Sequence, residues 1–143
     1  MRSILGAAIE EEADVTLVDM EAGLEHLSRS GGTLAYADIL LVVMEPSRKS
    51  ILTAGRTIAL AEELGIPRVY GIGNKAHLPD DAEFFASVAA EYKVPLAGIV
   101  PDDPDVVEAD RSGEPLAPDR GIPVRKAVEE IIDFVDKVLV GAA

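Results

Sequence analysis

Four short apolar runs, separated by stretches with helical spacing, constrain the fold more than any other feature of the sequence. The runs are residues 15–18, 39–44, 68–72 and 96–100. The run at 39–44 is continuously apolar, which is typical of a strand that is buried on both faces of a parallel sheet. Because strands alternate with helices along the chain, we expect an α/β domain with a parallel sheet of about four strands flanked by helices.

The expected helices lie between and around these strands. Ser47 or Ser50 can cap a helix that runs to about Leu64, just before Gly65 and Pro67. Further helices are predicted at 3–12, near 81–92 and within 102–112, and a last one begins at Val124. This last helix carries the clearest apolar stripe, formed by Val124, Val128, Ile131, Ile132, Val135, Val138 and Leu139. No repeat or low-complexity linker divides the chain, so we expect one domain over residues 1–143.

The composition excludes several classes of function. The formal net charge is -13, and such a surface repels nucleic acid and anionic membranes, although the same charge also suits an ordinary soluble protein. The absence of cysteine excludes disulfides, thiolate metal sites and cysteine nucleophiles. We see no signal peptide and no apolar run long enough to span a bilayer, so a cytoplasmic protein is expected.

Polar residues follow the predicted strands, at the end of the sheet where ligands of open parallel sheets bind. The first run ends at Asp19, a position suited to an acid that orients a Mg²⁺-bound water. Glu21 and Gly23 follow it. A glycine soon after the acid lets the backbone swing toward a phosphate. An aspartate at this place is more often a turn former or a helix cap, so the pattern alone is weak.

The segment 71–76 reads Gly-Ile-Gly-Asn-Lys-Ala and superficially fits a dinucleotide-binding fingerprint. The fingerprint needs a helix to open at once, and the residues from His77 to Pro79 prevent that. We expect Asn74 and Lys75 to lie just past a strand, where an Asn amide can pair with the edge of a purine base. A simple turn asparagine is an equally good interpretation.

Two other kinds of site are weakly supported. His26 and His77 are isolated histidines, for which surface or hydrogen-bonding roles are more plausible than metal binding. The 143 residues contain no G-x-x-x-x-G-K-[ST] loop, so the usual phosphate cradle of an ATPase is missing.

Four blocks in unbroken order carry a family resemblance. They are DVTLVDMEAGLEHLSR, ILLVVMEPSRKSILTAGRTIALAEELGI, RVYGIGNK and GIVPDDPDVVEADRSGEPL. Together they resemble the CooC-type ATPases, the nickel-insertion factors of carbon monoxide dehydrogenase within the MinD and nitrogenase-iron-protein superfamily of deviant P-loop enzymes. The resemblance covers roughly residues 4–118 and implies a truncated P-loop NTPase (Rossmann-like) fold.

The resemblance also implies residue roles. Asp19 would be the Walker B acid that holds Mg²⁺ indirectly, and Glu21 and Gly23 would belong to the switch that senses the γ-phosphate. On the base and ribose side of ATP or ADP, the matching residues are Asn74, Lys75, Pro101 and Asp103. Glu25 and His26 would lie near the face where two family subunits meet.

The departures from the family matter equally. Full members carry a deviant P-loop with two lysines and a Cys-x-Cys metal motif, and neither occurs here. We therefore expect weak or absent ATP binding, no ATPase activity of this chain by itself, and no nickel site. A degenerate or partial nucleotide-binding domain is the first hypothesis, and a non-enzymatic protein-interaction module that keeps the fold and the switch surface is the alternative.

The missing P-loop strand has a structural consequence. In the family it lies between the strand ending at Asp19 and the strand at 39–44, and a sheet cannot leave central N–H and C=O groups unpaired. Either these two strands pair directly, or another chain supplies the missing strand. If the strands pair in sequence order, right-handed crossovers put the connecting helices on one face, and the terminal helices or a second subunit must cover the other. We therefore expect a homodimer or a partner protein, such as a separately encoded P-loop half.

Overall fold

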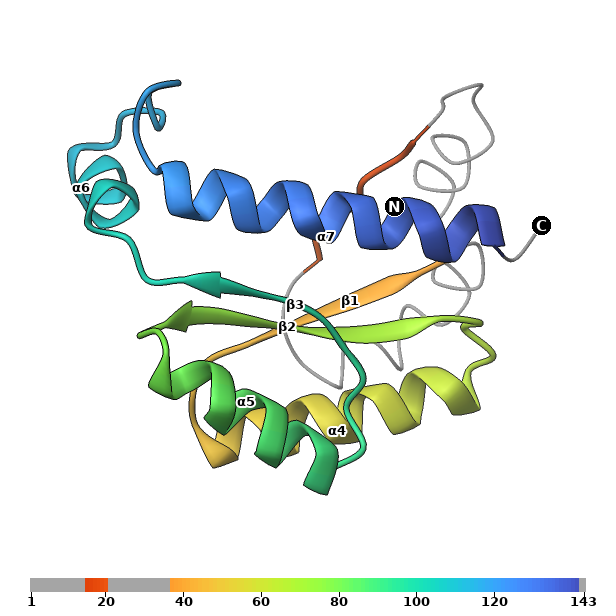
Figure 1. The fold of residues 1–143 in the computed structure, drawn as a ribbon. Coiled ribbons are helices and arrows are strands. Elements are labelled where there is room, and N and C mark those ends of the chain that lie inside the picture. The colour runs from red at the N-terminus through yellow and green to blue at the C-terminus, as the bar shows by residue number, and fades with distance from the viewer. Residues whose placement is uncertain (1–14, 21–36, 142–143) are drawn as a thin grey trace.

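The computed structural model describes residues 15–20 and 37–141, and within them the chain forms a three-layer α/β unit (Figure 1). The elements follow in the order β1 (Leu40–Met44), α4 (Arg48–Glu63), β2 (Val69–Ala76), α5 (Asp80–Glu91), β3 (Leu96–Pro101), α6 (Pro104–Ser112) and α7 (Ile122–Gly141). The predicted α/β architecture is confirmed. None of the helices in the described part of the chain combines the length and apolar character needed to cross a bilayer.

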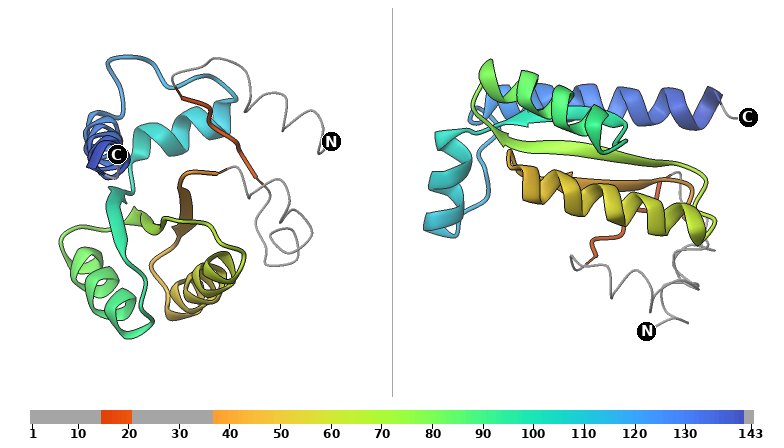
Figure 2. Two further views of the ribbon diagram at one scale, coloured as in Figure 1. Left: turned by 90° about the vertical axis from the view of Figure 1, so that its right-hand side faces the viewer. Right: turned by 90° about the horizontal axis from the view of Figure 1, so that it is seen from below.

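The sheet has three parallel strands in the order β1-β2-β3. Figure 2 shows α4 and α5 together on one face of this sheet and α7 on the opposite face. This is the arrangement expected for right-handed crossovers between strands paired in sequence order. The terminal helix α7 covers part of the second face, as one of the sequence-based alternatives requires.

The expectation of a strand at 15–18 is wrong for the described structure. Residues 15–20 belong to no helix or strand, and Val15 and Leu17 are 80% and 89% exposed. Met20 packs against the core cluster, so the segment touches the domain at its end. A strand needs a neighbour that satisfies its peptide groups. The sheet ends at β1, so among the described residues three strands form where about four were expected.

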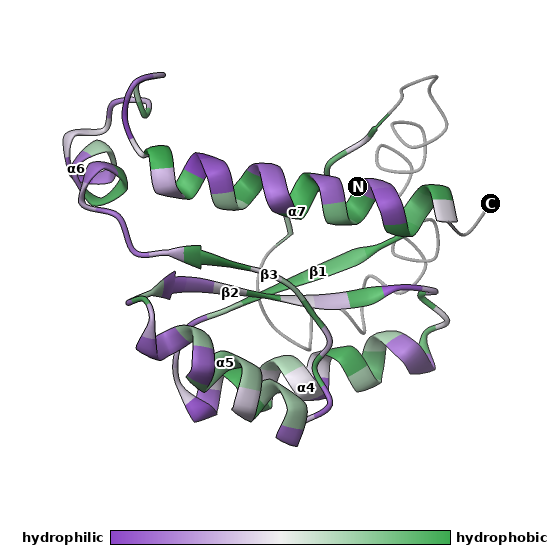
Figure 3. Cartoon of the chain, in the orientation of Figure 1, coloured by the Kyte–Doolittle hydropathy of each residue, from purple (hydrophilic) through white to green (hydrophobic). Residues whose placement is uncertain are grey.

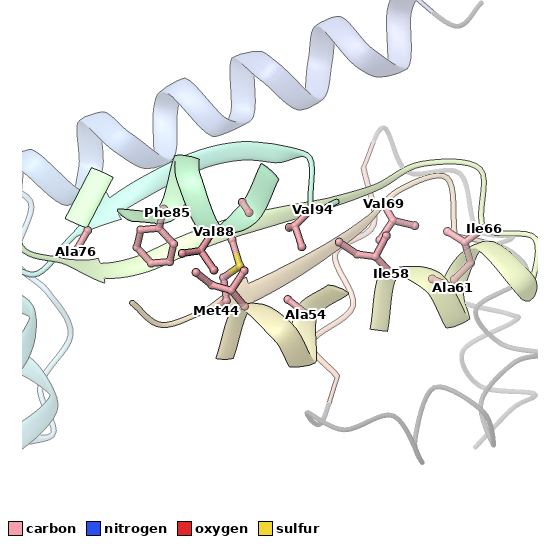
Figure 4. Close-up of a cluster of buried hydrophobic side chains, with 12 residues drawn as sticks. Met44, Ala54, Ile58, Ala61, Ile66, Val69, Ala76, Phe85, Val88 and Val94 are labelled. Carbon is pink, nitrogen blue, oxygen red and sulfur yellow. The ribbon is translucent and has the colours of Figure 1, made fainter. Parts of the chain in front are cut away.

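The core lies between the sheet and the α4–α5 layer, as the buried side chains in Figure 4 show. Ile51 and Ala61 of α4 and Phe85 of α5 are completely buried, and Met44 at the end of β1 is 1% exposed. Glycines let the layers approach closely. A Cβ at Gly73 would lie 2.9 Å from two atoms of the Phe85 ring, so β2 keeps a glycine at the point where α5 crosses it.

The helix ends follow the expected local rules. Ser47 accepts a hydrogen bond from the Ser50 backbone N–H at 3.1 Å and caps α4, and Gly65 follows this helix with φ +83°. Helix α5 begins at Asp80, in agreement with the sequence. Helix α7 begins at Ile122, two residues earlier than expected, because Pro123 occupies its first turn, where a proline needs no N–H partner.

The predicted stripe of α7 is only partly covered. Of its members, Ile131 is buried against β3, while Val128 and Ile132 are 42% and 53% exposed. Figure 3 shows this mixed character as alternating apolar and polar bands along α7. One helix resting on one edge of a sheet can bury only a narrow part of a wide apolar stripe.

Candidate functional site

The carboxyl ends of the three strands form one polar edge of the sheet, as the sequence predicted. Glu45 follows β1, Asn74 and Lys75 lie near the end of β2, and Asp102 follows β3. The Lys75 Nζ donates to the Glu45 Oε1 at 2.8 Å, and the Asp102 N–H donates to the Ala76 carbonyl at 2.9 Å. These contacts tie the ends of the three strands together.

Asn74 and Lys75 belong to β2 and do not lie past its end, which corrects the expected boundary at residue 72. Gly73 is in register with Ile99 and Ala76 with Pro101, so three steps along β2 match two steps along β3. This mismatch is a bulge-like register shift, which leaves one residue of β2 without a partner on β3. Bulges of this kind are frequent next to binding sites.

Lys75 takes a left-handed backbone conformation at this bulge, with φ +56°. Such a conformation costs a non-glycine residue roughly 1–2 kcal/mol, so the surrounding structure must hold it in place. The hydrogen bond to Glu45, followed by the charges of Glu45, Asp102 and Asp110, raises the pKa of Lys75 above its usual value. The lysine is therefore a cation surrounded by carboxylates.

Asp103 is buried, with 7% of the residue exposed, and it stands in the extended residue before α6. Its Oδ1 accepts the Asp105 N–H at 2.9 Å and caps the helix, with Pro104 at the first helical position. Its Oδ2 is shielded from solvent and has no hydrogen-bond partner among the described residues. An unpartnered buried acceptor costs about 1–3 kcal/mol, so a donor from outside the described residues would stabilise this site.

His77 extends the polar edge. Its Nδ1 lies 3.5 Å from Asp81 Oδ2, and its Nε2 lies 3.4 Å from Asp102 Oδ2. The contact with Asp81 follows an i, i+4 spacing that the sequence displays, whereas the contact with Asp102 comes from another strand end and has no local signal. The expectation of a hydrogen-bonding surface histidine agrees with this geometry.

Of the residues expected at the phosphate end, only Asp19 lies within the described part of the chain. Asp19 is exposed and lies in the segment 15–20, outside the three strands of the sheet. Glu21, Gly23, Glu25 and His26 lie outside the described residues. Within residues 15–20 and 37–141, no group of three or more acidic or histidine side chains is arranged to hold a metal ion. The described residues therefore supply no Mg²⁺ ligand set by themselves.

No model of a known protein family matches the chain, but individual proteins do. Over 113 residues it is 35% identical to the carbon monoxide dehydrogenase accessory protein CooC of Rhodospirillum rubrum, covering 79% of this chain and 41% of CooC. Over 138 residues it is 33% identical to an uncharacterised ATP-binding protein of Methanocaldococcus jannaschii, covering 96% of this chain and 52% of that protein. The chain is related to the CooC/MinD-like deviant P-loop ATPases.

The fold agrees with this relationship. The septum site-determining protein MinD of Pyrococcus horikoshii, solved in complex with Mg-ADP, superposes with a TM-score of 0.74 at 19% identity, covering 99% of this chain and 58% of MinD. The chain thus spans about half the length of the relatives it matches. The described α/β unit of this CooC/MinD-like chain corresponds to part of the MinD fold.

Proposed function

We propose that this CooC/MinD-like chain forms the base-binding half of a nucleotide-binding domain and has no ATPase activity by itself. The observation that supports the proposal is the register shift of β2 after Gly73, where Lys75 bonds to Glu45 beyond the end of β1. Asn74 is half-buried there and offers an amide that can both donate to and accept from a purine edge. Pro101 and Asp103 follow on the neighbouring strand and would border the base and the ribose.

The charges at this edge favour a nucleoside over a phosphate group. Lys75 is a cation at this edge, and its partner Glu45 lies 2.8 Å away. This pair is exposed and contributes little stability, yet a triphosphate would compete with the carboxylates around Lys75 for its ammonium group. The phosphate groups of ATP would therefore add almost nothing to its affinity for this chain alone.

The names of two relatives support nucleotide binding as the function of the complete domain. The MinD protein of P. horikoshii was solved with Mg-ADP, and the M. jannaschii relative is described as ATP-binding. If the present chain binds a nucleotide in the same place, Asn74, Lys75, Pro101 and Asp103 would meet its base and ribose. Asp19 would approach Mg²⁺ only when residues that supply the phosphate cradle are present.

A titration that compares adenosine with Mg-ATP tests this proposal. We expect both ligands to shift the same backbone amide signals near Asn74 in NMR spectra, with dissociation constants in the millimolar range or weaker, on the order of -4 kcal/mol. The Asn74→Ala variant should lose these shifts. Glu62→Gln is a suitable control, because Glu62 is exposed at the other end of α4.

Two results would contradict the proposal. If Mg-ATP binds at least tenfold more tightly than adenosine, a difference of about 1.4 kcal/mol in binding free energy, then this chain binds the phosphate groups directly. Any ATP turnover by the purified chain that disappears in Asp19→Asn would show that it is a complete enzyme.

The alternative, a non-enzymatic interaction module, is favoured by one specific observation. Apolar side chains remain exposed on the α7 side of the molecule, including Val43 at 63% and Ile132 at 53%. If neither adenosine nor ATP shifts any amide signal, the base-binding proposal fails and the interaction module becomes the better account.

A further inference from the structure

Strand β3 leads into helix α6 through Asp103, the residue that the proposed function places beside the base and the ribose. Helix α6 has no buried residue, and Val106 and Val107 are 38% and 40% exposed. Figure 1 shows this helix beyond the end of β3, beside the start of α7. Most helices in proteins are held by packing an apolar face. Because α6 buries no such face, contacts at its ends must fix its position.

Two contacts anchor the chain on either side of Asp103. Before it, the Asp102 N–H donates to the Ala76 carbonyl of β2 at 2.9 Å. After it, the Asp105 carboxylate reaches the turn that precedes α7, where its Oδ2 accepts the Gly121 N–H at 2.9 Å. The first anchor is a backbone bond that does not depend on the side chain. The second anchor depends on the side chain of Asp105.

The carboxylate of Asp105 makes two bonds of unequal weight. Its Oδ1 accepts from Arg120 Nη1 at 3.2 Å, but the Arg120 side chain is 61% exposed, and ion pairs with an exposed partner contribute little. The bond from the Gly121 N–H is shielded, because Gly121 is buried under Leu116. A hydrogen bond out of contact with water holds its partners more firmly. The bond to Gly121 is therefore the main contact between α6 and this turn.

The turn that Asp105 contacts is itself fixed to α7 by Arg125. The Arg125 guanidinium donates to the carbonyls of Arg120, Leu116 and Ala117 at 2.9, 3.0 and 2.9 Å. Helix α7 in turn packs on β3 through the buried Ile131. A continuous series of contacts thus runs from the sheet through α7 and Arg125 to the first turn of α6.

We propose that Asp105 is a positioning residue that holds Asp103 in place for a nucleoside. The Asp103 Oδ1 accepts the Asp105 N–H at 2.9 Å, so the two residues share one turn. This bond occupies Oδ1, whereas Oδ2 is buried without a partner among the described residues. Oδ2 is the oxygen that can accept from a hydroxyl or amino group of the ligand. This role rests on the proposed function, and Asp105 acts through Asp103 without touching the nucleoside.

An adenosine titration of the purified chain, followed by the amide signals near Asn74, tests this role. When binding is weak, the initial slope of the shift against adenosine concentration is proportional to the affinity. Asp105→Ala should reduce this slope about fivefold, the effect of one lost hydrogen bond. Asp105→Asn should restore it to within about twofold of the wild type, because the amide oxygen still accepts the Gly121 N–H. Glu108→Ala is the matched control, since it removes the same charge from an exposed position of α6.

A double variant separates positioning from a general loss of stability. Asparagine is also a good helix cap, but it has a single side-chain oxygen, which the cap uses. Asp103→Asn should therefore weaken adenosine binding while α6 stays capped. Adding Asp105→Ala to Asp103→Asn should cause little further loss, because the two changes act on the same contact with the ligand.

Amide hydrogen exchange reports the anchor in the free protein. The N–H groups of Val106 and Val107 donate to the Asp103 carbonyl at 3.1 and 3.2 Å. In Asp105→Ala they should exchange at least about tenfold faster than in the wild type, whereas Glu108→Ala should leave their exchange unchanged. Unchanged exchange in Asp105→Ala would mean that Asp105 does not hold this turn.

The outcomes of the titration are distinct. A wild type that shows no adenosine shifts near Asn74 would overturn the proposed function and the role of Asp105 together. A wild type that binds, with an Asp105→Ala variant that binds equally well, would overturn the role of Asp105 alone. A loss in the double variant that equals the sum of the two single losses would do the same, because Asp105 would then act independently of Asp103.

Discussion

The two faces of the sheet differ sharply in how completely they are covered. On the face of α4 and α5, Ile51, Phe85 and Ala61 are fully buried, and glycines in β2 allow close approach. On the other face, α7 buries only Ala127 and Ile131, and Val43 of β1 is 63% exposed. The first face is covered completely by helices of the same chain. The second face and the β1 edge keep apolar groups that another segment or protein could cover. This difference is consistent with a chain that corresponds to part of the MinD fold.

The largest expected effect is the loss of a core side chain. Phe85→Ala should lower the free energy of unfolding by about 3–5 kcal/mol, because the ring is completely buried and leaves a cavity. That is a large part of the total stability of a small domain. Urea denaturation followed by circular dichroism measures it.

The matched change on the other face is Ile132→Ala. Ile132 is 53% exposed, so this change should cost no more than about 0.5 kcal/mol. If both variants lower the free energy of unfolding by the same amount, the two faces are equally well packed. The difference between the faces described above would then be wrong.

A smaller effect is expected from adding a methyl group to the sheet. In Gly73→Ala the new Cβ would lie 2.9 Å from the Phe85 ring, and in Gly98→Ala it would lie 2.5 Å from Ile131 Cγ1. Overpacking of this kind costs about 1–3 kcal/mol. We expect the higher cost at Gly73, because Phe85 has no free side, whereas α7 can move away from β3. The same denaturation experiment measures both variants.

The double variant Gly98→Ala with Ile131→Ala provides the control for this prediction. It removes the atom that the new Cβ meets, so its cost should be smaller than the sum of the two single changes. A cost at Gly98 that exceeds the cost at Gly73 would show that α7 is held as firmly as α5.

Local patterns predicted most of the fold. The elements β1, α4, α5 and β3 lie within two residues of their expected ranges, because caps such as Ser47 and stops such as Gly65 act over a few residues. The strand expected at 15–18 did not form in the described structure, since pairing depends on a neighbour far away in the sequence. The extension of β2 to Ala76 was missed for a related reason: Gly-Asn-Lys is typical of a turn, but pairing with Pro101 resumes after the left-handed Lys75.

The candidate site was predictable where it depends on strand order. Parallel strands end on one side, so the gathering of polar residues at one edge of the sheet followed from the sequence. The helix-capping role of Asp103 was missed, although an aspartate before a proline is a recognisable start of a helix. The contact of His77 with Asp102 joins two strand ends and depends on the register of β2 and β3, which the sequence does not display.

Residue-resolved amide hydrogen exchange in β1 tests the central claim most directly. In dilute solution, the amides of Leu40, Val42 and Met44 should exchange slowly because they bond to β2. The amides of Leu41 and Val43 should exchange at least tenfold faster, since they face the open edge. Equal protection of all five amides would contradict the account, because it would mean that the sheet is already complete.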